Sequence, residues 1–375
     1  MTRRDFLKRL SLGLASVGAI SSAGELLTRA KAFAAAPSLL THEAMYYKKL
    51  DDETVQCELC PRGCTLSNGQ RSFCRVREPK GGKLYTAAYG AACSAHVDPI
   101  EKKPLFHFLP GTAVFSIATA GCNFRCKCCQ NWQISQIGPE DAQNIPMSPA
   151  ELVAQTRRNS CPTVAYTYTE PSIFYEYMLD CAKAVRSAGL RNMYHSNGYL
   201  NRKPVEELSA YLDAADVDLK GFTDDFYAQM SAGSLSPVLA TLKTLKNRGV
   251  WLEITNLVVP TMNDDLGKVK EMCGWIVQNL GPDVPLHVSR FWPQYKLTQL
   301  APTPVETLEG VRTTALAEGL HYVYIGNVPG HPAEHTYCPK CKATVIQRSG
   351  YTILKNGLVD GACKACGERI AGIWS

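Results

Sequence analysis

The sequence predicts an α/β fold built on a parallel sheet, between a cysteine-rich N-terminal segment and a small C-terminal metal-binding module. Runs of β-branched and apolar residues alternate with helical patterns from residue 111 to residue 334. Polar side chains stand at the ends of several of these runs. Most of the 16 cysteines fall into three groups, before, at the start of, and after the alternating region. Strands that alternate with helices are typical of a parallel sheet covered by helices.

The chain opens with the pattern of an export signal, so residues 1–36 are set apart from the fold. Basic residues precede a modestly apolar run, Leu10 to Ala23, and small residues follow it. The run is too short and too interrupted for a stable membrane span. The stretch TRRDFLK resembles a twin-arginine signal, with Arg3 and Arg4 as the pair. We therefore expect export to the periplasm or cell envelope, or a membrane tether if the signal is retained.

The net charge of +6 does not indicate a nucleic-acid partner. Residues 1–36 hold six Lys/Arg and two Asp/Glu, and the remainder holds 34 basic and 32 acidic residues, a net of only +2. Because no basic stripe stands outside the N-terminal segment, we expect no nucleic-acid binding.

The segment 45–110 carries four cysteines in the pattern Cys57-x2-Cys60-x3-Cys64-x9-Cys74. Glycine and proline turns lie among them, so the four thiols can converge on one ion or cluster. Zinc, an auxiliary iron–sulfur cluster and a disulfide pair are all compatible with this spacing. Export keeps the disulfide alternative open.

The first strand of the alternating region, 113–120, leads directly into GCNFRCKCCQNW, which contains Cys122-x3-Cys126-x2-Cys129. Four thiolates close a structural site, whereas three thiolates on a four-iron cluster leave one iron open to an exchangeable ligand. The spacing therefore indicates a catalytic site, and Cys128 is interpreted as a non-ligand. A redox or zinc loop is the structural alternative.

Strand–helix units continue at regular intervals after this loop. Further strands are expected at 163–171, 190–198, 214–220, 250–260, 284–291 and 321–327, and helices near 172–188, 203–212, 236–248, 266–280 and 305–318. Gly189, Gly249 and Gly319 stand between a helix and the next strand, as C-cap glycines do. A doubly wound open sheet is the alternative. No Gly-x-Gly-x-x-Gly follows the first strand, which argues against dinucleotide binding.

Polar residues stand in or at the ends of these strands, where a parallel barrel carries its functional groups. They are Glu170 (with Pro171), Asn197 (with Gly198), Asp218, Lys220 and His287. Together with the cysteine loop they define a candidate cofactor site. A structural ion pair is the alternative reading of Asp218 and Lys220.

The segment 335–375 carries Cys338-x2-Cys341 and Cys363-x2-Cys366, separated by 21 residues. This is close to the spacing of a zinc ribbon, and VIQRSGYTIL supplies a short hairpin between the two pairs. Four thiolates would close a tetrahedral site, so we expect a structural zinc ion whose binding is coupled to folding of this module.

The cysteine loop resembles the cluster motif of radical S-adenosylmethionine (SAM) enzymes. The resemblance implies a partial parallel (βα) barrel of the radical SAM type, with a [4Fe-4S] cluster on Cys122, Cys126 and Cys129 and with SAM on the open iron. Glu170 and Pro171 match the second half of a Gly-Gly-Glu-Pro motif whose glutamate binds the methionyl amine. Asp218-x-Lys220 is similar to a SAM-holding pair of glycyl-radical activating enzymes, in which the position of His287 offers another polar contact. Asn197 completes the expected cofactor-binding set.

Longer stretches of the chain resemble the radical SAM member of the AmmeMemoRadiSam system. Among them are HVDPIEKKPLFHFLPG, AYTYTEPSIFYEY and HVSRFWPQYK. That family is similar to pyruvate formate-lyase activating enzymes. The resemblance implies partners of the Memo and Amme families and an electron donor of the flavodoxin or ferredoxin type.

The expected function is oxidoreductase-like: reductive cleavage of SAM to a 5′-deoxyadenosyl radical that abstracts hydrogen from an unidentified substrate. A glycyl-radical activase acting on a partner protein is the alternative within enzymes. An exported iron–sulfur or zinc protein without catalytic activity is the alternative from another class.

Overall fold

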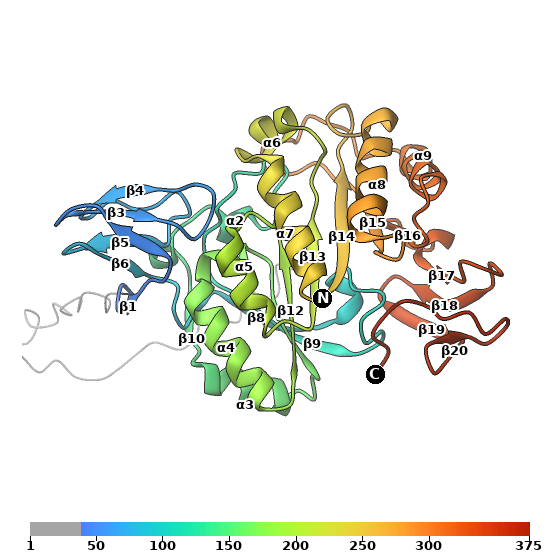
Figure 1. Ribbon diagram of the computed structural model, residues 1–375, viewed down its shortest axis with the longest axis horizontal. Coiled ribbons are helices and arrows are strands. Elements are labelled where there is room, and N and C mark those ends of the chain that lie inside the picture. The colour runs from blue at the N-terminus through green and yellow to red at the C-terminus, as the bar shows by residue number, and fades with distance from the viewer. Residues whose placement is uncertain (1–38) are drawn as a thin grey trace, which may run out of the picture. The chain divides into compact units, whose positions relative to one another are not determined.

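The computed structural model describes residues 39–375, so the predicted signal at 1–36 lies outside the described residues. At its centre is an eight-stranded sheet in the order β16-β15-β14-β13-β12-β11-β9-β8 (Figure 1). Each strand from β9 onward pairs in parallel with the next, and β8 joins β9 in the antiparallel direction. Since strand order follows chain order, each strand–helix unit adds one strand beside the last. The sheet is partial-barrel-like, which confirms the predicted α/β class.

All seven expected strands are present, with ends that differ by a few residues. The sheet consists of β8 (Ser94–Pro99), β9 (Ala113–Ala118), β11 (Thr163–Tyr166), β12 (Arg191–Ser196), β13 (Ala214–Asp218), β14 (Trp251–Val258), β15 (Leu286–Arg290) and β16 (Val323–Gly326). Strand β8 lies within the segment 45–110 that was assigned to the cysteine-rich region. The sequence of β8, SAHVDP, shows no alternation of apolar and polar residues that would predict a strand. Asp98 is its only buried residue.

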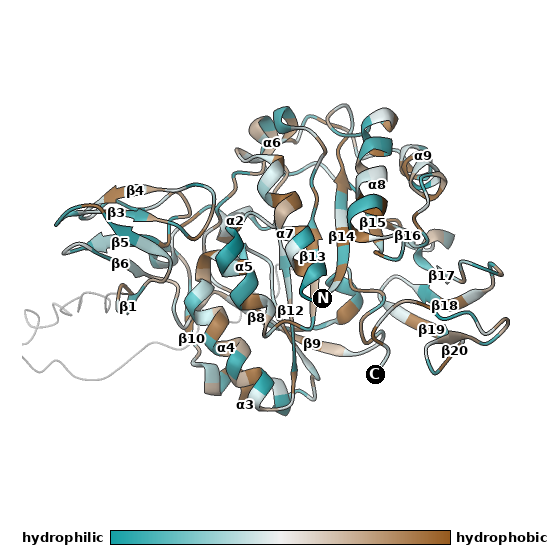
Figure 2. Ribbon diagram, in the orientation of Figure 1, coloured by the Kyte–Doolittle hydropathy of each residue, from teal (hydrophilic) through white to brown (hydrophobic). Residues whose placement is uncertain are grey.

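The longer helices between these strands cover the outer face of the sheet (Figure 1), whereas the short helices α2 and α6 lie beside the cysteine loop. They are α2 (Trp132–Ser135), α3 (Pro149–Arg158), α4 (Tyr175–Ser187), α5 (Arg202–Ser209), α6 (Asp224–Ser231), α7 (Leu235–Asn247), α8 (Leu266–Leu280) and α9 (Val305–Ala317). Gly189, Gly249 and Gly319 adopt positive φ angles after α4, α7 and α9, as expected of C-cap glycines. Hydrophilic and hydrophobic residues alternate along α4, α7 and α8 (Figure 2), the pattern of helices with one face in the core.

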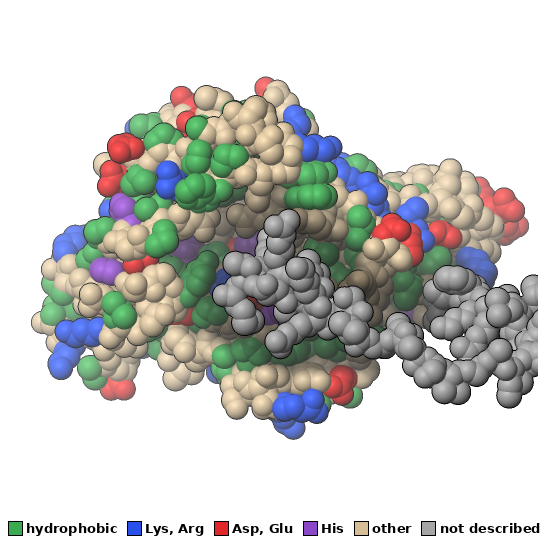
Figure 3. Space-filling view, turned by 180° about the vertical axis from the view of Figure 1, so that it is seen from behind, with side chains coloured by type: hydrophobic (Ala, Val, Ile, Leu, Met, Phe, Trp, Pro, Cys, Tyr) green, Lys and Arg blue, Asp and Glu red, His purple; other side chains and the backbone are tan. Residues whose placement is uncertain are grey.

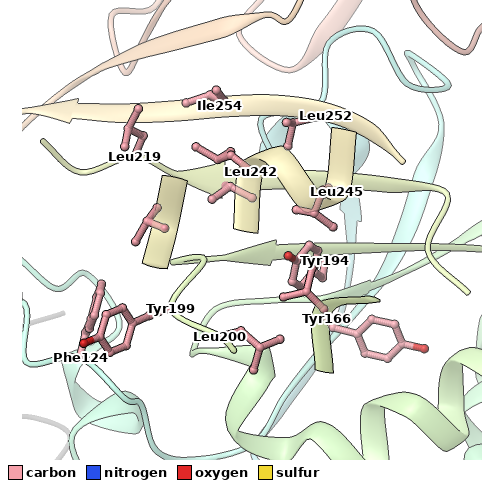
Figure 4. Close-up of a cluster of buried hydrophobic side chains, with 14 of the residues drawn as sticks. Phe124, Tyr166, Tyr194, Tyr199, Leu200, Leu219, Leu242, Leu245, Leu252 and Ile254 are labelled. Atoms are coloured by element: carbon pink, nitrogen blue, oxygen red, sulfur yellow. The ribbon is translucent and has the colours of Figure 1, made fainter. Parts of the chain in front are cut away.

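The core lies between the helices and the sheet. Leu242 and Leu245 of α7 lie near Leu252 and Ile254 of β14, and all four side chains are buried (Figure 4). Burying each such side chain contributes about 1.5–3 kcal/mol. The opposite face of the same strands changes character along their length: in β13, Ala214 belongs to a second, smaller apolar cluster, whereas Asp216 and Asp218 on the same face are polar. Alternation along each strand thus separates a packing face from a functional face.

Two small antiparallel sheets precede the central sheet, and a third follows it. The first two contain β1 (His42–Glu43), β5 (Arg77–Lys80) and β6 (Lys83–Thr86), and β2 (Tyr47–Lys49), β3 (Thr54–Cys57) and β4 (Thr65–Ser67). The third contains β17 (Thr336–Tyr337), β18 (Thr344–Ser349) and β19 (Thr352–Asn356), so the expected C-terminal hairpin is present. Short pairs are β7 (Ala91–Ala92) with β10 (Ile145–Pro146), and β20 (Leu358–Val359) with β21 (Ala362–Cys363).

No helix within residues 39–375 combines the length and apolar character needed to cross a membrane. Over the face shown in Figure 3, the described Lys and Arg side chains are interspersed with acidic and apolar ones and form no continuous stripe.

Candidate active site

A cavity of about 410 Å³ opens at the carboxyl ends of the parallel strands. Seven of the eight residues predicted to hold the catalytic cluster or its cofactor line it: Cys122, Cys126, Cys129, Glu170, Asn197, Asp218 and Lys220. They come from the loops after β9, β11 and β12, from the last residue of β13 and from the loop after it. Parallel strands place the residues at their carboxyl ends along one edge of the sheet, which explains why positions up to 98 residues apart meet here.

The cysteine loop begins at Gly121, which has a φ of +107°. A Cβ at this position would lie 2.6 Å from the carbonyl oxygen of Cys74, so only glycine allows the two segments to pack this closely. Beyond Gly121, the backbone N–H of Phe124 donates to Sγ of Cys122 over 3.3 Å. Steric fit at Gly121 therefore positions the first predicted ligand against the N-terminal segment.

The other two thiols of the motif also have polar neighbours. Sγ of Cys126 lies 3.4 Å from the hydroxyl of Ser231, and Sγ of Cys129 lies 3.2 Å from the hydroxyl of Ser135. Both cysteines are free. Three free thiols on one cavity wall, each with a polar contact to its sulfur, fit a thiolate-ligated iron–sulfur cluster, whose potential is tuned by such contacts.

Cys128 lines the same cavity. Its backbone carbonyl accepts a hydrogen bond from Nε2 of Gln294 over 3.1 Å. The interpretation of Cys128 as a non-ligand therefore rests on its place in the motif, and a variant can test it directly.

Glu170 is fixed at the end of β11 by three hydrogen bonds. Its Oε1 accepts from the backbone N–H of Ser172 (3.0 Å) and the hydroxyl of Ser196 (2.8 Å). Its Oε2 accepts from the backbone N–H of Asn197 (2.8 Å). Burial raises the pKa of Glu170, and the hydrogen bonds from Asn197 and Ser172 oppose this rise. The carboxylate thus joins the ends of β11 and β12 while it borders the cavity.

Asn197 links this strand end to the cysteine loop. Its Nδ2 donates to Oδ1 of Asn123 over 2.8 Å and lies 3.9 Å from Sγ of Cys122. Nδ2 of Asn123 in turn donates to the carbonyl of Tyr199 over 2.8 Å. Sequence reasoning missed Asn123, although it directly follows the first predicted ligand.

His195, Asp218 and Lys220 line the cavity and form a charged network with Asp216 behind them. Nζ of Lys220 lies 2.9 Å from Oδ2 of Asp218, and Nε2 of His195 lies 3.5 Å from the same oxygen. Nδ1 of His195 lies 2.5 Å from Oδ1 of Asp216, and the carboxylate of Asp216 accepts a hydrogen bond from the hydroxyl of Thr255. The predicted alternative of an ion pair between Asp218 and Lys220 is therefore present in the structure, but the pair borders the cavity instead of lying in the core.

The network sets unusual protonation states. Burial alone would lower the pKa of His195, but the carboxylates of Asp218 and Asp216 outweigh it and raise the pKa to about 10. Burial raises the pKa of Asp216 to about 6 against the opposing effect of His195. Burial acts in the same direction on Asp218, but Lys220 and His195 hold its pKa well below the usual range. His195 was also missed by the sequence reasoning, although it precedes Asn197 by two residues and therefore shares its face of β12.

His287 does not line the cavity, in contrast to the expected contact with SAM. Its side chain is 3% exposed, its Nε2 lies 2.7 Å from Oε2 of Glu253, and its ring stacks on Tyr324. The physical reason is depth along the strand: Ser289, two residues later on the same face of β15, reaches the cavity. His287 thus lies on the same strand and face as a residue that lines the cavity, but deeper in the sheet.

Tyr168 and Thr169 stand where many radical SAM proteins have Gly-Gly before Glu-Pro. The contacts of Tyr168 show how a residue larger than glycine fits there. Its φ is +64°, a left-handed conformation that costs a non-glycine residue about 1–2 kcal/mol. The tyrosine hydroxyl donates to Asp98, and Nζ of Lys103 lies 4.2 Å from the ring centroid. Nδ2 of Asn131 donates to the Tyr168 carbonyl over 2.7 Å. These contacts offset the strain and leave Tyr168 on the cavity wall.

The other two cysteine groups also converge. Sγ atoms of Cys338, Cys341, Cys363 and Cys366 all lie within 4.8 Å of one another. Cys57, Cys60, Cys64 and Cys74 line a second, much smaller cavity. All of these cysteines are free, so the structure does not contain the alternative disulfide.

Comparison with known proteins agrees with this geometry. Residues 116–273 match the family described as the Radical SAM superfamily, so the chain contains a domain of that superfamily. It is also 48% identical to the uncharacterized protein MJ0808 of Methanocaldococcus jannaschii over 330 residues, which cover 88% of this chain and 98% of that protein. The two proteins belong to one family within the superfamily.

More distant similarity extends to two activating enzymes. The pyruvate formate-lyase-activating enzyme of Clostridium pasteurianum is 24% identical over 169 residues, 43% of this chain and 67% of that enzyme. The (2S)-3-sulfopropanediol dehydratase activating enzyme of Klebsiella oxytoca is 24% identical over 233 residues, 59% of this chain and 70% of that enzyme. The predicted radical SAM class and its distant similarity to glycyl-radical activating enzymes are confirmed.

Proposed function

We propose that this protein is a radical SAM enzyme that holds a [4Fe-4S] cluster on Cys122, Cys126 and Cys129. It would cleave SAM reductively, and the resulting 5′-deoxyadenosyl radical would abstract hydrogen from a substrate that is not identified. One observation carries the proposal: three free thiols and a set of strand-end polar residues line one cavity of about 410 Å³. This volume is within the usual range for small-molecule sites.

The protein residues have separable roles in this proposal. When bound, the cluster would supply the electron that breaks the sulfonium bond, while the protein binds and orients the reactants. Glu170 and Asp218 provide the acceptors that an ammonium or ribose hydroxyl group requires. Lys220 and protonated His195 keep Asp218 ionised, because they stabilise its charged form. Walls of buried side chains shield the reactive species from water.

Finer features of the proposal rest on sequence resemblance. They are membership of the AmmeMemoRadiSam system, partners of the Memo and Amme families, and a flavodoxin- or ferredoxin-like electron donor. Export by the twin-arginine route, or a tether through a retained signal, is proposed from residues 1–36. A structural zinc ion is proposed for the C-terminal cysteines, and the mutual proximity of the four thiols supports it.

Two alternatives remain distinct from this proposal. Similarity to two activating enzymes favours a glycyl-radical activase acting on a partner protein, which would leave an EPR-detectable glycyl radical on that partner. An exported iron–sulfur protein without catalytic activity would bind no SAM. The charged network beside the cysteine loop opposes this second alternative, because an electron carrier has no need of it.

The decisive experiment is anaerobic. The protein is reconstituted with iron and sulfide, reduced with dithionite and supplied with SAM, and 5′-deoxyadenosine is quantified. We expect product from the parent and from Cys128→Ala, but none from Cys129→Ala. Product from Cys129→Ala at the parent rate would refute the ligand assignment. A reduced cluster in the parent without SAM binding would refute the enzyme and favour the electron carrier.

A further inference from the structure

The four N-terminal cysteines surround a small cavity that adjoins the candidate active site. Cys57 and Cys74 are buried, whereas Cys60 and Cys64 are partly exposed. All four line one cavity, to which Asn123 also contributes. Because Asn123 directly follows Cys122, the two cysteine groups share a wall of the protein.

The spacing of these four thiols differs from that of the C-terminal group. Tetrahedral zinc with Zn–S bonds of about 2.3 Å holds its sulfurs about 3.8 Å apart, so single-ion sites are compact. Within residues 39–375, the C-terminal cysteines are the one group of four thiols that lie within 4.8 Å of one another. The N-terminal thiols are therefore more widely spaced around their cavity. A [4Fe-4S] cluster binds each thiolate to a different iron and requires this wider arrangement.

Two arginines line the cavity, and each has one buried N–H group without an acceptor in the described residues. Arg77 is fully buried, and its Nη2 lies 2.5 Å from Oε1 of Glu176, while its Nη1 donates to the Met45 carbonyl and lies 3.8 Å from Sγ of Cys57. Nε of Arg77 has no hydrogen-bond partner in the described residues, and neither has buried Nη2 of Arg62. A buried N–H without an acceptor costs about 1–3 kcal/mol, so these groups indicate an anionic occupant. Four thiolates on iron and sulfide provide one.

Direct contacts join this cavity to the active-site loop. Nε of Arg62 donates to the backbone carbonyl of Asn123 over 3.0 Å. Gly121 packs against the Cys74 carbonyl so closely that a Cβ would lie 2.6 Å from it. The guanidinium of Arg125 donates to the carbonyls of both Cys122 and Phe73. A single layer of backbone and side chains therefore separates the two cysteine groups.

We propose that Cys57, Cys60, Cys64 and Cys74 bind a second [4Fe-4S] cluster that relays electrons to the active-site cluster. The relay rests on the proposed function. A reduced flavodoxin- or ferredoxin-type donor would lose one electron to this cluster, and the same electron would pass to the active-site cluster. Its transfer to SAM breaks one C–S bond and yields methionine and the 5′-deoxyadenosyl radical. Cys60 and Cys64 are partly exposed, so the donor would approach the cluster on the side of these two residues.

The metal content of two variants tests the site independently of activity. After anaerobic reconstitution, the parent should hold about eight irons per chain, and both the triple variant Cys122→Ala/Cys126→Ala/Cys129→Ala and the double variant Cys60→Ser/Cys64→Ser should hold about four. The triple variant should retain the EPR signal of a reduced cubane. An additional zinc ion in place of iron in the triple variant, or no metal at the N-terminal group, would overturn the proposal.

Turnover then tests the relay. With reduced flavodoxin as donor, we expect Cys60→Ser/Cys64→Ser to bind SAM as the parent does but to form 5′-deoxyadenosine at least tenfold more slowly. An unchanged rate would overturn the relay. Failure of the proposed function gives a different result: the parent would form no 5′-deoxyadenosine, while the triple variant would still hold its N-terminal cluster.

Discussion

Substitution of Gly121 by alanine tests the packing that holds the two cysteine groups together. The added Cβ would lie 2.6 Å from the Cys74 carbonyl oxygen and 2.7 Å from Cγ2 of Val76, at a φ of +107°. Both distances are well inside van der Waals contact, and neither neighbour is the free end of a flexible side chain. The backbone of one segment must therefore move.

The expected cost has two parts. Positive φ costs a non-glycine residue about 1–2 kcal/mol, and overpacking adds about 1–3 kcal/mol, which sum to about 2–5 kcal/mol. Gly189→Ala is the matched control, because Gly189 has a φ of +73° with nothing within 4 Å of its added Cβ. The free energy of unfolding of Gly189→Ala should fall only by the cost of the positive φ angle, about 1–2 kcal/mol.

Urea unfolding followed by circular dichroism, at equal metal loading, measures both values. Iron content after reconstitution gives the functional consequence, and we expect Gly121→Ala to incorporate less iron than Gly189→Ala. Equal unfolding free energies for the two variants would refute the steric argument. The same result would mean that Gly121 and the Cys74 carbonyl are not in close contact, and the two cysteine groups would then lose one of the contacts that join them.

Three further predictions address other parts of the chain. The pKa of His195 is raised from 6.5 to about 10, so its stabilising effect is complete below pH 6.5 and is lost as the pH rises toward 10. His195→Gln should therefore flatten the fall in unfolding free energy across this range, and an unchanged pH profile would contradict the raised pKa. His287→Asn should lower stability by about 1–3 kcal/mol, because Glu253 loses a buried partner, yet leave SAM affinity unchanged in a titration. Weaker SAM binding would return His287 to the site. Cys341→Ser should remove about one zinc per chain and make residues 335–375 sensitive to protease, whereas Cys273→Ser should retain the metal.

Much of the fold follows from local patterns in the sequence. Strand–helix alternation predicted the parallel sheet and its covering helices, whereas the sequential strand order, which excludes the doubly wound alternative, came from the structure. Polar residues at the predicted strand ends identified most of the residues that line the cavity. Glu170, Asn197 and Asp218 are far apart in the chain but meet because parallel strands end at a common edge.

The tertiary structure alone decided several features of the site. Period-two alternation determines which face of a strand a residue occupies, but not its depth relative to the cavity, which depends on the stagger between strands. His287 therefore lies below the site, whereas Ser289 borders it. The sequence did not predict strand β8, because its residues bury little apolar surface when it pairs with β9 and therefore show no hydrophobic pattern.

Cysteine spacing in the sequence determined that three groups of thiols could each bind a metal. Only the structure determined that two of these groups share a wall and that the third is more compact. Spacing along the chain restricts how closely thiols within one loop can approach. The distance between separate loops depends instead on packing contacts, such as Gly121 against Cys74, that no local pattern encodes.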